Sequence, residues 1–122
     1  MVITDKYLEE MAKAAAGSTF DTLNYFSVGE TVAVIGTTTA VLPGEVGSRK
    51  ATSVARTDNV IEFTATRLAT DVVDTIDGDD IKTFGSNVAS SGSDLLSGVS
   101  VAGVTHTTAF DLDLILTVSV VR

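Results

Sequence analysis

Residues 108–121 constrain the fold most, because apolar residues occupy every second position over most of this segment. One face carries Phe110, Leu112, Leu114, Leu116, Val118 and Val120. A period of two is typical of a β-strand with one buried face. The opposite face carries Asp111 and Asp113 in the first half, but only apolar or neutral residues in the second half. We therefore expect the second half of this strand to be covered on both sides.

Strands and turns are also expected in the rest of the chain after Gly17. β-Branched residues are dense there, and clusters of Gly, Ser, Asp and Asn recur between them, as in β-sandwiches. Asp58-Asn59 is expected to form a tight hairpin turn. Besides 108–121, the pattern predicts strands at residues 22–28, 31–35, 50–56, 60–68, 81–84 and 95–104.

One helix is predicted, over residues 5–16. Thr4 is a good N-cap, and Gly17 suits the left-handed residue that follows a helix. A narrow apolar stripe at helical spacing should lie on the rest of the fold, and the charged side should face solvent. The stripe consists of Leu8, Met11, Ala12 and Ala15, and the charged side of Glu9, Glu10 and Lys13. The predicted fold class is mainly β: one domain over residues 1–122, an antiparallel, jelly-roll-like β-sandwich with one short N-terminal α-helix.

The composition predicts a domain with a packed core. The chain has 122 residues, of which 44% are hydrophobic, and this is too apolar for a disordered segment. No apolar run is long enough to span a bilayer, and no signal peptide is visible. Cysteine is absent, which excludes disulfides and thiolate metal ligands.

The charge is strongly acidic, with 16 acidic residues against 8 basic ones and a formal net charge of −8. This balance argues against a nucleic-acid partner, which requires clustered Lys and Arg. Asp outnumbers Glu and lysines are few, as in proteins adapted to high salt, where ions screen the repulsion between carboxylates. An ordinary acidic domain has the same composition, and both interpretations stay open.

Residue patterns for catalysis are scarce, so we expect that this protein is not an enzyme. His106 is the only histidine, and we expect it in an exposed turn or at an interface. The chain has neither a Gly-x-Ser-x-Gly motif nor a phosphate-binding loop with its lysine. No cofactor is expected. The weak candidates for a calcium site are Asp74, Asp77, Asp79 and Asp80, whose alternative role is a solvated acidic turn.

A surface for association remains as the candidate functional feature. Small sandwiches leave edge strands that pair readily with neighbouring chains. The residues expected at interfaces are Leu8, Met11, Glu45, Arg49, Ile115, Thr117, Ser119 and Val121. Glu45 and Arg49 are expected either to tie a long loop to the body or to form a weak surface ion pair.

The order of several short motifs resembles the small tail-fibre, baseplate and tip structural proteins of tailed bacteriophages and archaeal tailed viruses. The likeness runs from the helix through four segments to the closing strand at residues 107–121. These segments are Leu23-Asn24-Tyr25-Phe26-Ser27-Val28-Gly29, the loop at residues 42–49, Asn59-Val60-Ile61-Glu62-Phe63-Thr64-Ala65, and residues 81–96. None of these motifs is catalytic.

The resemblance implies a structural virion protein that homo-oligomerises and docks to neighbouring tail or capsid proteins. It implies a ring of three or five copies in a virion assembled in the host cytoplasm, and the acidic composition suggests a virus of salt-loving archaea. The alternatives are a carbohydrate- or host-receptor-binding module, with contact to the host cell surface, or a capsid decoration or turret protein. Either of these is compatible with stabilisation by calcium. No membrane span is expected in any of them.

Overall fold

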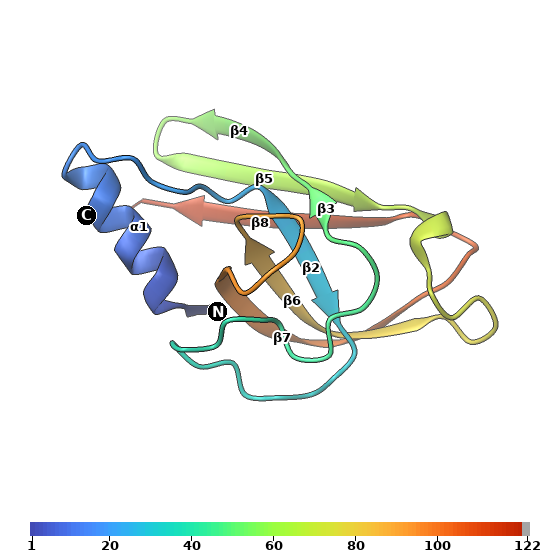
Figure 1. Cartoon of the computed structure of the whole chain (residues 1–122). Helices are drawn as coiled ribbons and strands as arrows, with labels where there is room; N and C mark the ends of the chain where they lie inside the picture. The colour runs from blue at the N-terminus through green and yellow to red at the C-terminus, as the bar shows by residue number, and fades with distance from the viewer. Residues whose placement is uncertain (121–122) are drawn as a thin grey trace.

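Two antiparallel sheets and one short helix make up the computed structural model, which describes residues 1–120 (Figure 1). The larger sheet has five strands in the order β1, β7, β6, β2, β3: Val2–Ile3, Leu95–His106, Asp79–Asn87, Tyr25–Gly29 and Lys50–Ala51. The smaller sheet has three strands in the order β4, β5, β8: Ser53–Thr57, Val60–Arg67 and Leu112–Ser119. Helix α1 covers Asp5–Ala15, and a short 3₁₀ turn, η1, covers Ala69–Asp71. The predicted β-sandwich with one N-terminal helix is confirmed.

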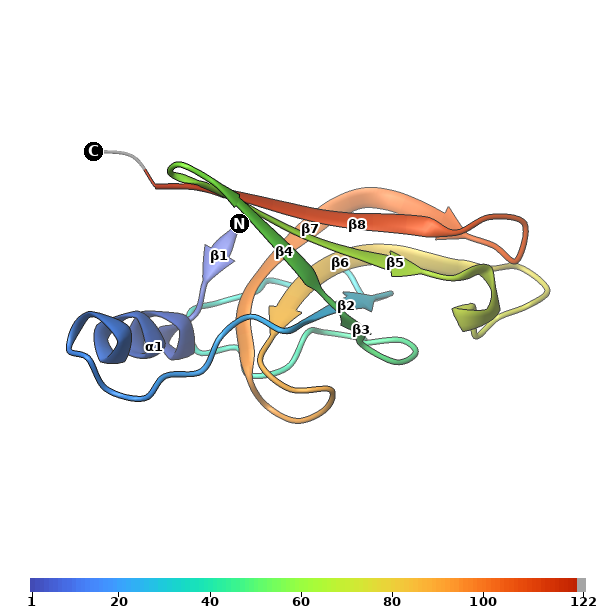
Figure 2. The same ribbon diagram turned by 90° about the horizontal axis from the view of Figure 1, so that it is seen from above.

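The two sheets are connected along one side of the sandwich. Only Thr52 separates β3 from β4, so the chain passes there from the larger sheet to the smaller one (Figure 2). The amide of Thr52 donates to the carbonyl of Asn24 at 2.9 Å, which attaches this crossing to the residue just before β2. On the opposite side, β7 and β8 are not paired with each other. The sandwich is therefore closed on one side and open on the other.

The core lies between the sheets and consists mainly of aliphatic residues and phenylalanine. Phe26, Val28, Ile81 and Leu114 form its main cluster, and the ring centroid of Phe26 lies 4.8 Å from that of Phe84. A second cluster under the long loop after β2 consists of Ile35, Leu42 and Leu95. The inward residues of β5 and β8 reach the main cluster by the alternation that their sequence predicts.

Helix α1 is where predicted, but the face that it presents to the fold is not the predicted one. Glu10 is buried, whereas Leu8 and Met11 are 54% and 53% exposed. The Glu10 carboxylate accepts the Asp21 amide at 2.6 Å and also contacts the ammonium groups of Lys6 and Lys13. Because these polar contacts orient the helix, its narrow apolar stripe faces solvent.

The helix start is confirmed in detail. The Thr4 hydroxyl accepts the Tyr7 amide at 3.4 Å and donates to the carbonyl of Leu95 at 2.7 Å. The Thr4 amide in turn donates to the carbonyl of Leu96. One residue therefore caps α1 and attaches it to β7.

The strand predictions were accurate for some segments and wrong for others. The strand expected at 60–68 corresponds to β5, and the turn residue Asp58 has a φ of 52°. The strand expected at 31–35 is absent. Its residue Ile35 is nevertheless buried in irregular backbone. The strand expected at 50–56 is divided at Thr52, and the one expected at 81–84 extends over Asp79–Asn87.

Candidate functional site

A buried polar network connects the two sheets at one end of the sandwich, and Arg67 is its centre. Arg67 is the last residue of β5 and continues the inward face of Ile61, Phe63 and Ala65. Its Nη2 donates to Oδ2 of Asp79 at 2.5 Å and to the carbonyl of Asp71 at 3.2 Å. Its Nη1 donates to Nδ1 of His106 at 2.6 Å. The guanidinium therefore holds together β5, the start of β6 and the end of β7.

His106 belongs to this network, so the expected exposed or interface position is wrong. The side chain is 0% exposed. Because Arg67 can only donate, Nδ1 of His106 is the acceptor, and Nε2 then donates to the carbonyl of Phe110 at 2.9 Å. Both ring nitrogens are thus occupied by structural hydrogen bonds. The imidazole has no contact with solvent through which a substrate proton could be exchanged.

Asp79 is the buried carboxylate that balances the charge of Arg67. Burial raises its pKa, but the amides of Asp74 and Val73 and the guanidinium of Arg67 together lower it by more. The pKa of Asp79 therefore lies below its ordinary value. The carboxylate is therefore held charged inside the fold by two amide donors and one cation.

The four aspartates suggested for calcium do not converge. Asp79 is occupied by Arg67, the Asp74 carboxylate accepts the amides of Ile76 and Asp77, and Asp80 lies 3.4 Å from Lys82. Within residues 1–120, no group of three or more acidic, histidine or cysteine side chains is placed to hold a metal ion. The segment is built as a turn, with Asp74 as the residue that closes it.

The expected pair of Glu45 and Arg49 is present, and it is more than a surface contact. Nε of Arg49 lies 2.9 Å from Glu45 and its Nη1 lies 2.7 Å from Asp94. The same guanidinium donates to the carbonyls of Ala89 and Gly92. Arg49 is buried, so it connects two loops inside the chain and is not available as the interface contact that the sequence suggested.

The other candidate interface residues within the described chain are exposed. Leu8 and Met11 are exposed on α1, where Met11 also lines a hollow of about 260 Å³ between the helix and the sheets. Ile115, Thr117 and Ser119 lie on the outer face of β8. The second half of β8 is thus not covered on both sides by any described part of this chain, contrary to expectation. Val121 falls outside residues 1–120.

Strand β8 is an edge strand along its whole length. It pairs with β5 over eight consecutive residues without a register shift, and its other side has no partner strand among residues 1–120. Beside it, β7 is paired with β1 only at Ser97 and Gly98, so its later residues also form an edge. A hollow of about 220 Å³ lies between these two edges. Its lining is mainly apolar and includes Val101, Val104, Leu112, Leu114 and Ile115.

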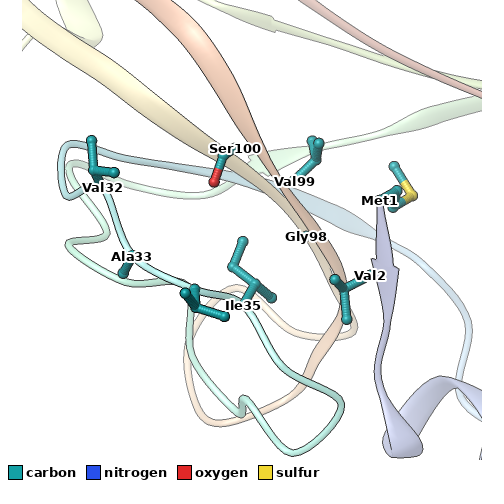
Figure 3. Close-up of a pocket in the computed structure, with 9 residues that line it drawn as sticks. Met1, Val2, Val32, Ala33, Ile35, Gly98, Val99 and Ser100 are labelled. Atoms are coloured by element: carbon teal, nitrogen blue, oxygen red, sulfur yellow. The ribbon is translucent and has the colours of Figure 1, made fainter.

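A second apolar hollow, of about 470 Å³, lies where β1 meets β7 (Figure 3). The irregular segment with Val32, Ala33 and Ile35 forms one side, and Met1 and Val2 stand across from it beside Gly98 (Figure 3). Val34 in the same segment is almost fully exposed. Exposed apolar surface therefore gathers around the free edge of β7 as well as along β8.

The comparisons with known proteins add no relative to this picture. No protein-family model matches the chain, and no curated protein and no solved structure matches it either. In the described part of the chain, no helix combines the length and the apolar character that crossing a bilayer requires.

Proposed function

We propose that this chain is a non-enzymatic structural protein that works by assembling with copies of itself, as a component of a virus particle. The observation that carries the proposal is the free edge of β8. Strand β8 has eight residues, alternate ones of which direct their backbone groups to this edge, and the second half of the strand carries no charge. An edge of this length without protection pairs readily with another chain.

The use of the polar groups supports a structural role. The three most buried ionisable side chains, Arg67, Asp79 and His106, bond to one another and to backbone groups. Arg49 is similarly occupied by two carboxylates and two carbonyls. These networks stabilise loops and sheet ends.

The location in a virion rests on the resemblance of the motifs to tail and tip proteins. The charge supports a salt-rich setting, because copies with a net charge of −8 repel one another unless ions screen them. Assembly should therefore become stronger as the salt concentration rises.

Light scattering after size-exclusion chromatography tests the assembly. From about 0.1 M to about 3 M NaCl, where the screening length falls from about 10 Å to below 3 Å, the mass should rise to a closed oligomer. A monomer at every salt concentration and at high protein concentration would refute the proposal. Antibodies against the protein should also label purified particles of the virus that encodes it, and failure to label them removes the virion location.

A further inference from the structure

The free edge of β8 presents a defined set of backbone groups. The amide of Val120 donates to the carbonyl of Asn59, which is in the turn before β5, at 2.9 Å. In an antiparallel pair, successive residues point their N–H and C=O groups alternately toward the partner strand and away from it. Four residues of β8 therefore direct these groups away from β5: Asp113, Ile115, Thr117 and Ser119.

This edge lacks the features by which proteins prevent edge-to-edge pairing. Natural edge strands are protected by lysine, by proline, by bulges or by being very short. Strand β8 has eight residues, contains no lysine or proline, and keeps a regular register with β5. Strands β1 and β3 have two residues each, and β4 has five. The part of β7 beyond Gly98 is also a free edge, but a shift in its register with β6 interrupts it between Ser100 and Val104, where Gly103 has a φ of 81°.

The charges on β8 select one direction of pairing between two copies. Asp113 lies near the start of the strand, Asp111 comes just before it, and no charge follows up to Val120. Parallel pairing would place the aspartates of two copies side by side, which is unfavourable. Antiparallel pairing places them at opposite ends of the joint strand pair, away from the aspartates of the other copy.

We infer that the partner is a second copy of this chain, and that the two β8 strands pair antiparallel about a two-fold axis at Leu116. The inference rests on the proposed function and specifies its contact. Only one register uses all four outward-directed residues: it pairs Asp113 with Ser119 and Ile115 with Thr117 of the second copy. On the inner face, Leu116 then meets its own copy, and Leu114 meets Val118.

This register also continues the apolar inner face of the smaller sheet. Leu112 lies opposite Val120 of the second copy, and Val120 is 63% exposed in the single chain. The added strand lies alongside the hollow between β7 and β8 and shields Val101 and Val104 from water. The four residue pairs exchange about eight backbone hydrogen bonds. The contact is isologous, so it predicts an even-numbered assembly in place of a ring of three or five.

Proline substitution at two equivalent edge positions tests the contact. Thr117→Pro removes an outward amide of β8, and Val54→Pro removes an outward amide of β4 at the other edge of the same sheet. Neither amide is used within the sheet, so both variants should fold, as circular dichroism and thermal melts can verify. In about 3 M NaCl, Thr117→Pro should weaken dimer formation at least tenfold, and Val54→Pro should leave it unchanged.

Cysteine crosslinking tests the register. The natural chain has no cysteine, so a disulfide can form only between introduced residues. Ile115→Cys and Thr117→Cys are both at exposed positions, and in the proposed pair their Cα atoms lie about 5.5 Å apart, within the range for a disulfide. Mixing the two variants under mild oxidation should give a covalent heterodimer. Each variant alone, and Ile115→Cys mixed with Val54→Cys, should give much less.

The outcomes separate this inference from the proposed function. Loss of the dimer in Thr117→Pro together with crosslinking in the mixture supports both. An oligomer that survives Thr117→Pro and gives no crosslink overturns the β8 contact but leaves assembly intact. A protein that is monomeric at every salt concentration overturns both, and binding of β8 to a different protein only would overturn the two-fold contact.

Discussion

Arg67→Met is the substitution that tests the buried network most directly. Methionine keeps an unbranched side chain of similar length but removes three donated hydrogen bonds: to Asp79, to His106 and to the carbonyl of Asp71. Asp79 would remain buried with two amide donors and no cation. Removing one partner of a buried ion pair typically costs about 3–5 kcal/mol. That is a large part of the roughly 5–15 kcal/mol by which a domain of this kind is stable.

The assay is urea unfolding at low salt, followed by far-ultraviolet circular dichroism because the chain has no tryptophan. The free energy of unfolding should fall by about 3–5 kcal/mol with little change in the urea dependence. In a double-mutant cycle, Arg67→Met combined with Asp79→Asn should cost less than the sum of the two single changes. A cost below about 1 kcal/mol for Arg67→Met, or strict additivity, would refute the reasoning.

The acid side of the stability profile gives a second check. The pKa of Asp79 in the folded state lies below its ordinary value of 3.8, so its contribution is present above that pH. The contribution is lost as the pH falls from about 3.8 through the lower folded-state pKa, because the unfolded chain then binds the proton more tightly. In Arg67→Met the guanidinium that lowers the pKa of Asp79 is removed, so this pKa should rise toward its ordinary value and the loss of stability below pH 3.8 should become shallower.

Three further predictions follow from single contacts. Arg49→Ala should lower the free energy of unfolding by about 3 kcal/mol, because it leaves Glu45 and Asp94 without their cation. It should also speed hydrogen exchange in residues 89–94, and unchanged exchange there would contradict the role given to Arg49. The pKa of Glu10 is lowered from 4.5 to about 2, first by the Asp21 amide and then by Lys6 and Lys13. Glu10→Gln should therefore lower the free energy of unfolding above pH 4.5. It should also remove the fall in stability that Glu10 causes between pH 4.5 and about 2, as measured by urea unfolding at several pH values. Phe26→Ala should destabilise by about 3–5 kcal/mol in the same assay, because the side chain is fully buried in the main cluster.

The alternating segments were predictable from the sequence because they bury one face within the chain itself. Strands β5 and β8 follow their apolar period closely, and the turn between β4 and β5 follows from Asp58. The strand expected at 31–35 failed for a different reason. Its residues have the composition of a strand, but Ile35 is buried against Leu42 and Leu95 from irregular backbone, so burial there does not require strand pairing.

The buried network was missed, although part of it was visible in the sequence. Arg67 stands at the same phase as Ile61, Phe63 and Ala65, so its position on the inward face of β5 could have been read directly. An inward arginine requires a buried acceptor, and Asp79 stands at the inward phase before Ile81. The position of His106 could not be read, because it depends on how the end of β7 meets β5. The orientation of α1 could not be predicted because one partner of the Glu10 carboxylate, the amide of Asp21, lies outside the helix.

The attachment of α1 to β7 also sets the order in which this chain can fold. Thr4 bonds to the carbonyl of Leu95, 91 residues further along the chain, and Val2 pairs with Gly98. During synthesis, the first helix has no docking site until almost the whole chain has left the ribosome. Such distant contacts slow folding, typically to milliseconds or seconds. Until β7 is in place, β6 exposes the edge that β7 later covers, and an exposed strand edge of this kind favours aggregation of the newly made protein.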